Sequence, residues 1–177
     1  SGSGSVSVTS VGRDVQAKTG SGDIAVASIG GAVTLRTGSG DIVAKEVTQA
    51  ADLSTGSGDI TATLTGKGDV RANSGSGSIQ LNGVIGLVTA SSASGDVHVN
   101  GRPTGDWKLS AASGDVLVQL PSEQGFTLDA TTASGDLDVA GPLTVQGKIE
   151  KRRIQGTVRG GGPTLRVSTA SGDIAVR

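Results

Sequence analysis

The chain has 177 residues, of which 34% are hydrophobic and 1% aromatic, and its formal net charge is −1. This charge argues against a general attraction to nucleic acid, and the absence of cysteine excludes disulfides, thiolate metal sites and a cysteine nucleophile. No apolar run reaches 18 residues, so we expect no membrane span in this fragment. Because the chain starts inside a repeat and without Met, we expect an export or anchor segment upstream of it.

A short motif, Ser-Gly-Asp followed by a branched apolar residue, recurs along the chain. Full copies begin at Ser21, Ser39, Ser57, Ser94, Ser113, Ser134 and Ser171, and Ser-Gly-Ser copies begin at Ser3 and Ser76. Successive copies start 18, 18, 18, 19, 18, 19, 21 and 37 residues apart. A period near 18 that is kept over most of a chain is typical of a repeat architecture.

Apolar and polar residues alternate on both sides of this motif. With the Asp (or its Ser replacement) as position zero, positions +1, +3, −8 and −6 are apolar in almost every copy, as in Ile42, Ala44, Val33 and Leu35. The positions between them are mostly polar or small. This period of two predicts short strands with one buried face, and no helix is expected before about residue 140.

Each repeat therefore predicts one coil with two strands, the first ending near position −4 and the second starting near +1. The Thr-Gly-Ser-Gly-Asp segment between them has glycines for a tight corner and an Asp that can accept backbone N–H groups. The Thr or Ser at position −4 points inward and is expected to hydrogen-bond along the rod axis. We expect an all-β, single-stranded parallel β-helix (β-solenoid), right-handed, with about 18 residues per coil and nine to ten coils.

The regular pattern stops in the 37-residue gap between the last two motifs. We expect residues 1–177 to form a single β-solenoid domain, with an irregular, capping excursion at about 141–163. Ile149, Ile154 and Val158 are expected to face the core there, and the glycines of 160–162 precede the last coil.

The Ser-Gly-Asp-Ile repeats and the Gly-Gly-Gly-Pro-x-Leu-x-Val-x-Thr-x-Ser-Gly-Asp-Ile ending resemble the bacterial DUF4097 family, β-strand repeat proteins with a suggested adhesin role that look related to the head-GIN-domain adhesins. The resemblance implies a parallel β-helix that is exported or in the cell envelope, and no established activity. Two other solenoids with 18 residues per coil fit less well. The calcium-binding nonapeptide repeat places its Asp one position away, and the left-handed β-helix has three units per coil instead of two.

The repeated Asp residues form the best candidate metal site. Stacking places Asp23, Asp41, Asp59, Asp96, Asp115, Asp136 and also Asp173 in one column along the rod. Like charges at this spacing repel, so the carboxylates must be well exposed, bound by corner N–H groups or neutralised by cations. Carboxylate oxygens are ligands that calcium prefers, so calcium binding is one alternative for this column. A corner-capping role is the simpler interpretation because Ser5 and Ser78 interrupt the column.

Other chemistry-bearing residues are few. The basic cluster Lys148, Lys151, Arg152 and Arg153 is a candidate site for an anionic partner, although a solvated loop is the simpler interpretation. His98 is expected to point outward beside Gln80 and Leu117, and Trp107 and Phe126 to fill the core. We therefore expect no catalytic site, no metal and no other cofactor apart from the calcium alternative.

The sequence favours a non-enzymatic, adhesin-like or structural β-solenoid of the bacterial cell envelope, periplasmic or extracellular. It would display repeated polar faces to a surface polymer or protein that the sequence does not identify. The alternatives are a self-assembling scaffold that stacks end to end as a homo-oligomer, a calcium-binding repeat protein and, least favoured, a polysaccharide-acting enzyme that uses residues 141–163.

Overall fold

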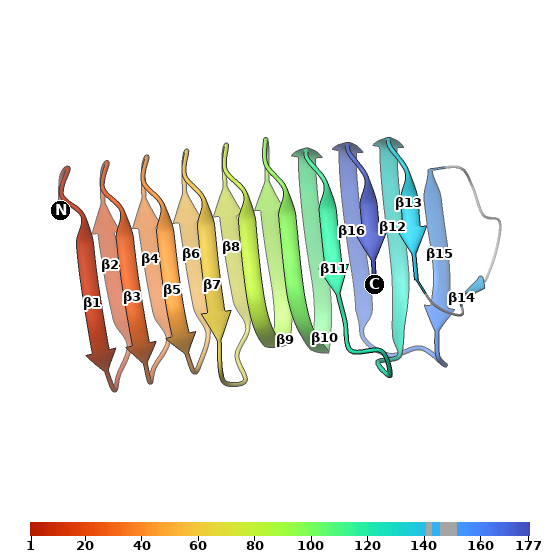
Figure 1. Ribbon diagram of the computed structural model, residues 1–177, viewed down its shortest axis with the longest axis horizontal. Coiled ribbons are helices and arrows are strands. Elements are labelled where there is room, and N and C mark those ends of the chain that lie inside the picture. Colours follow the sequence, from red (N-terminus) through yellow and green to blue (C-terminus); the bar gives the residue numbers. More distant parts are fainter. Residues whose placement is uncertain (141–142, 146–151) are drawn as a thin grey trace.

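The computed structural model describes residues 1–140, 143–145 and 152–177. In these residues all regular structure is β-strand, and there is no helix. The strands form an elongated, flattened stack with two opposite faces, and most strands pair in parallel with a strand of the next coil (Figure 1). The predicted fold class, an all-β parallel solenoid, is confirmed.

The two faces are built from alternate strands. Face A contains β1 (Val6–Val11), β3 (Ile24–Ile29), β5 (Ile42–Val47), β7 (Ile60–Leu64), β11 (Val116–Gln119), β17 (Ile174–Val176) and β13 (Leu137–Val139). Face B contains β2 (Val15–Thr19), β4 (Val33–Thr37), β6 (Ala51–Thr55), β8 (Val70–Ser74), β16 (Thr164–Ser171), β12 (Phe126–Ser134) and β15 (Arg153–Val158). The long strands β9 (Ile79–Ser92) and β10 (Val97–Ser113) run from face A into face B, and β14 (Leu143–Val145) pairs with β15.

The core follows the alternation in the sequence. Equivalent residues of neighbouring coils stand opposite each other, as Ile42 does with Ile60 and Leu35 with Leu53. These four side chains are completely buried between the two faces. Many strands begin at position +1 and several end at position −4, as predicted, so the repeat period sets the register of most parallel ladders.

One further core column comes from a break in the alternation. Ser10, Ser28 and Glu46 have φ angles of 58°, 57° and 54°, in the left-handed region. This conformation turns the chain so that the next residue points inward, and Ile29 and Val47 are therefore buried. Strict period-two reasoning does not find this column because it assumes that every residue is extended.

The corner glycines allow close stacking of the backbone. A Cβ atom on Gly40 would collide with the carbonyl oxygen of Gly22, and one on Gly58 would collide with that of Gly40. The φ angles of both glycines lie outside the left-handed region. The corner therefore requires glycine because there is no space for a side chain between coils, whereas the sequence suggested a need for special backbone angles.

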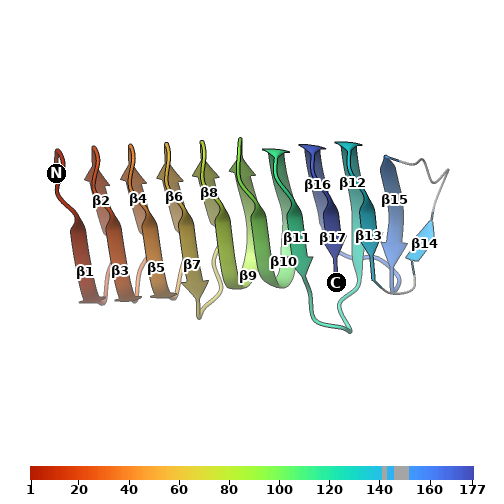
Figure 2. The ribbon, with the colours of Figure 1, turned by 45° about the horizontal axis from the view of Figure 1, so that its top comes forward.

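The order of coils in space differs from their order in the chain. About six turns, from β1 to β10, follow one another regularly, so the expected run of nine to ten successive coils is wrong. After β10, the C-terminal coil is inserted between earlier ones: β16 pairs with both β10 and β12, and β17 pairs with both β11 and β13 (Figure 2). The C-terminus therefore lies within the stack.

Antiparallel strands lie at the end of the stack next to β12. β15 pairs antiparallel with β12, and β14 pairs antiparallel with β15. Val158 is fully buried and Ile154 is half-buried against the core, as predicted, while Ile149 lies outside the described residues. At the opposite end, β1 pairs with β3 and β2 pairs with β4, each on one side only among the described strands.

Candidate functional site

The outer surface of face B carries two straight columns of polar side chains. Because side chains alternate along each strand, every coil presents two outward residues at the same two heights. In stacking order, the first column is Gln16, Thr34, Asp52, Arg71, Thr89, Lys108, Arg166, Asp129 and Gln155, and the second is Lys18, Arg36, Ser54, Asn73, Ser91, Ser110, Ser168, Thr131 and Arg153.

Positive charge dominates these two columns. They contain six Lys or Arg residues and two acidic residues, Asp52 and Asp129. Both acidic residues form ion pairs, Asp52 with Arg36 and Asp129 with Arg153, each with an N–O distance of 3.2 Å. The other four cations are exposed and form no salt bridge within the described part of the chain; they are Lys18, Arg71, Lys108 and Arg166.

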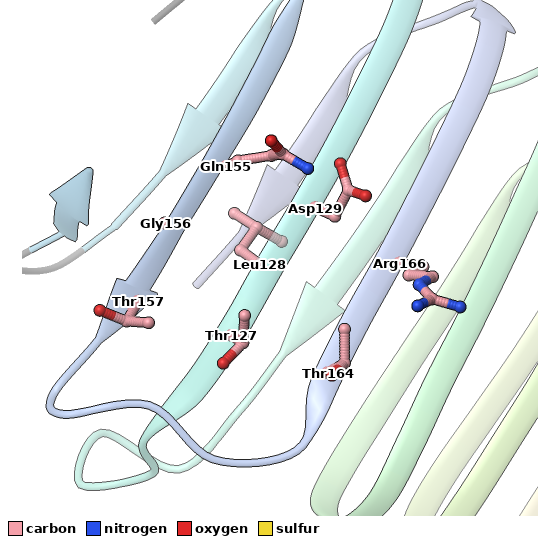
Figure 3. A pocket seen from close by; sticks show the side chains of 8 residues that line it. All are labelled: Thr127, Leu128, Asp129, Gln155, Gly156, Thr157, Thr164 and Arg166. Carbon is pink, nitrogen blue, oxygen red and sulfur yellow. The ribbon is translucent and has the colours of Figure 1, made fainter. Parts of the chain in front are cut away.

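A hollow of about 330 Å³ lies in face B where β12, β15 and β16 run side by side. Asp129 lies between Gln155 of β15 and Arg166 of β16 and is in register with both (Figure 3). The buried residues Gly156 of β15 and Leu128 of β12, which are in register with each other, also line it. The Nε atom of Arg153 donates to Oδ1 of Asp129 at 3.3 Å, so this carboxylate is already neutralised.

A second shallow hollow of about 320 Å³ lies on the same face, over β8, β9 and β10. Its walls are small side chains, partly polar, as Asn73, Ser91 and Ser110 are, and partly alanines. The hydroxyl group of Ser110 donates to that of Ser91 at 3.1 Å. Lys108 projects from the same strand as Ser110, two residues away, so a cation borders this row of hydroxyl groups.

Face A is more weakly charged. His98 lies on this face, exposed and in register with Gln80 and Leu117, and its predicted position is confirmed. It lines a small hollow of about 140 Å³ together with neutral amide side chains. The aromatic residues are also where the sequence predicted: Trp107 is fully buried with its Nε1 donating to the carbonyl oxygen of Gly86 at 2.9 Å, and Phe126 is buried.

The Asp column lies along the corner that joins the two faces. The Oδ1 atom of Asp23 accepts the backbone N–H of Asp41, and Oδ1 of Asp96 accepts that of Asp115, at 3.0 and 2.9 Å. Asp173 and Asp136, which are distant in the chain, are joined in the same way at 2.8 Å. These carboxylates therefore hold adjacent coils together. Within the described residues, no group of three or more His, Cys, Asp or Glu side chains is placed to bind a metal ion.

The opposite corner contains a second set of Asp residues that the sequence reasoning missed. Oδ1 of Asp14, Asp69 and Asp106 accepts the backbone N–H groups of Ala32, Leu87 and Thr164, at 2.9 to 3.0 Å. The sequence does contain a sign of this second Asp set. In the dipeptides Gly68-Asp69 and Gly105-Asp106, an Asp stands directly before the inward position −8. These bonds serve the same structural purpose as those of the main Asp column.

Only part of the predicted basic cluster can be located. Arg153 lies at the start of β15 and binds Asp129, and Arg152 precedes it on the surface, whereas Lys148 and Lys151 lie outside the described residues. The cations of the regular coils, Arg71, Lys108 and Arg166, were not predicted as candidates. The sequence could have indicated them, because all three occupy the outward position −7 of their repeats. Stacking aligns the residues of one position, so these three cations lie in one column.

The family model described as Toastrack DUF4097 matches residues 1–177, the whole chain. No curated protein and no solved structure matches it. In the described residues, the structure has no helix that is both long and apolar enough to cross a membrane. The chain belongs to the Toastrack DUF4097 family, as its repeats indicated.

Proposed function

We propose that this protein is a non-enzymatic binding rod of the bacterial cell envelope, adhesin-like in action, that displays repeated polar side chains to a surface polymer or protein. One observation carries this proposal: the outward residues of face B stand in straight columns, one pair per coil. The many ladders of backbone hydrogen bonds make the stack rigid, so these columns keep a fixed spacing.

Because each coil presents similar side chains, a partner would bind this surface through weak contacts with many coils and not through one strong contact. The hollow over β8, β9 and β10 and the one beside His98 are open and lined by small or neutral side chains, so each would give a partner only a small contact area. A partner that spans several coils gains from effective concentration, because every contact after the first is intramolecular. A long, repetitive partner therefore suits this surface best.

The positions of the acidic groups support a non-enzymatic role. Glycosidases use two carboxyl groups that face each other across a substrate. Here the corner carboxylates accept backbone N–H groups, as Asp41 and Asp115 do. In the hollow of Figure 3, Asp129 is paired with Arg153.

The proposal is tested by binding to immobilised envelope polymers of different lengths. We expect retention to rise steeply with polymer length, because long chains contact more coils, and we expect the polymer to keep its length after incubation. Binding that is independent of length would contradict multivalent display. Shortening of the polymer, measured by size-exclusion chromatography, would contradict the non-enzymatic assignment.

A scaffold that assembles end to end is the second candidate. It is favoured by the parallel ladders, in which each coil pairs with the next as β1 does with β3, because the edge strand of such a stack offers backbone groups to a further strand. Such an edge can pair with another strand. Light scattering over a range of protein concentrations tests this function: growing particles would support it, and a constant monomer mass would count against it.

A further inference from the structure

We propose that face B binds an extended polysaccharide that carries carboxylate groups and lies along the rod axis. Arg71, Lys108 and Arg166 bind the carboxylates, and the neighbouring Ser and Asn side chains bind sugar hydroxyl groups. This inference rests on the proposed function and names its partner class.

The charges of the protein are segregated, although the net charge is only −1. The Asp residues of the repeats lie at the two corners, as Asp41 and Asp69 do, where they accept backbone N–H groups. Most outward charges of face B are positive, and its two acidic residues are already paired with arginines. A polyanion that approaches face B therefore meets, in the middle coils of this face, cations without a salt-bridge partner among the described residues, namely Arg71, Lys108 and Arg166.

Two of these cations are direct neighbours. Lys108 of β10 and Arg166 of β16 stand opposite each other in the ladder, and Arg71 lies two coils from Lys108, separated by Thr89. Like charges directly opposite each other on neighbouring strands are destabilising. Asp129, which stands opposite Arg166 on its other side, offsets this repulsion only in part because its carboxylate is already paired with Arg153, so a bound anion would relieve the remainder.

The spacing fits a sugar chain that crosses the strands. Neighbouring strands lie about 4.8 Å apart, close to the length of one sugar residue in an extended chain. The cations therefore meet carboxylates on successive or alternate sugar residues. Arginine binds a carboxylate through two parallel N–H bonds, which suits Arg71 and Arg166.

Beside the cations runs a row of small polar groups. Asn73, Ser91, Ser110 and Ser168 follow one another in the second column, and the first three line the hollow over β8, β9 and β10. Hydroxyl and amide side chains both donate and accept hydrogen bonds, as sugar hydroxyl groups do. Single-stranded nucleic acid is disfavoured as the ligand, since Trp107 and Phe126, the two aromatic residues of the chain, are buried and cannot stack on bases.

The test uses polygalacturonate, which has a carboxylate on every sugar residue, with dextran as the neutral polymer and polyphosphate as the second polyanion. The test variant is Arg71→Gln/Lys108→Gln/Arg166→Gln. The matched control, Lys45→Gln/Lys67→Gln/Arg102→Gln, removes the same charge from exposed residues outside face B. Binding is measured by biolayer interferometry at two salt concentrations, after circular dichroism shows that each variant is folded.

We expect polygalacturonate to bind best, the face B variant to lose about tenfold in affinity, and the control to stay close to wild type, because each exposed ion pair contributes a little. Unchanged affinity of the face B variant would overturn the inference. Equal binding of polyphosphate would overturn the choice of a carboxylate-bearing sugar chain. If only dextran or another neutral polymer binds, the display function stands and this inference fails; if no polymer of any length binds, the proposed function fails as well.

Discussion

The Oδ1 atom of Asp41 accepts a hydrogen bond from the backbone N–H of Asp59, one coil further along the stack, at 2.9 Å. The same bond joins Asp59 to Ser78 and Asp115 to Asp173, each at 2.8 Å. It explains how a column of carboxylates is tolerated: each side chain satisfies an N–H group of the next coil and remains exposed to water, which screens the repulsion.

The first prediction separates hydrogen bonding from charge in this column. Asp41→Ala is expected to destabilise the protein by about 1 kcal/mol, because the N–H of Asp59 loses its acceptor. Asp41→Asn keeps an oxygen in place and removes one like charge, so its stability is expected to equal or exceed that of wild type. Urea denaturation measures both. Equal destabilisation by Ala and Asn would show that the negative charge itself is needed.

The second prediction concerns the glycine column. Gly58→Ala is expected to destabilise by about 3 kcal/mol or more, since its Cβ would collide with the carbonyl oxygen of Gly40, which the hydroxyl group of Thr55 holds in place by a hydrogen bond. Gly12→Ala is the matched control, because nothing lies within 4 Å of a Cβ at Gly12. Thermal unfolding compares the two variants. Similar melting temperatures would show that coils can separate without much cost.

The third prediction tests the buried hydroxyl column. The hydroxyl group of Thr55 donates to the carbonyl oxygen of Gly40 at 2.8 Å and accepts the N–H of Gly58 at 3.1 Å. Thr55→Val has the same shape but leaves both backbone groups unpaired, so we expect a loss of about 2 to 3 kcal/mol. Thr55→Ser keeps the hydroxyl group and should cost less than half as much, since Ser74 occupies the equivalent position of a neighbouring coil. A larger loss in Thr55→Ser than in Thr55→Val would mean that packing of the methyl group decides.

The sequence predicted the residues that share a column well, because stacking and alternation are both encoded locally. The pairing of Leu35 with Leu53 and the burial of Trp107 follow directly from the period. The additional core column with Ile29 and Val47 was missed because it depends on the left-handed conformation of Ser28 and Glu46, two residue types that rarely adopt it. The basic surface of face B was present in the sequence but spread over distant repeats.

The order of the last coils could not be predicted from the repeat. Residues 131–137 read Thr-Thr-Ala-Ser-Gly-Asp-Leu and residues 168–174 read Ser-Thr-Ala-Ser-Gly-Asp-Ile, so either segment fits beside β10. A periodic sequence specifies which residues share a column and leaves the order of similar coils open. In the structure, β16 takes the place beside β10 and separates it from β12.

The fourth prediction tests this insertion with engineered cysteines, which the natural chain lacks. Ser110 of β10 stands opposite Ser168 of β16, and Ser168 stands opposite Thr131 of β12. The pair Ser110→Cys/Ser168→Cys is therefore one strand spacing apart, about 4.8 Å, and should oxidise readily to a disulfide. If the coils stacked in chain order, Ser110 would instead face Thr131.

The matched control is Ser110→Cys/Thr131→Cys, which the structure places two strand spacings, about 10 Å, apart. Two cysteines with Cα atoms more than about 7 Å apart cannot be bridged without backbone movement, so this pair should stay reduced. Non-reducing gel mobility and thiol titration after mild oxidation measure both pairs. A disulfide in the control variant and none in the test variant would show that the C-terminal coil lies outside β12, and the stack would then follow chain order. The expected result would show that the last 14 residues, 164–177, close the rod from within, because they link β10 and β11 to β12 and β13.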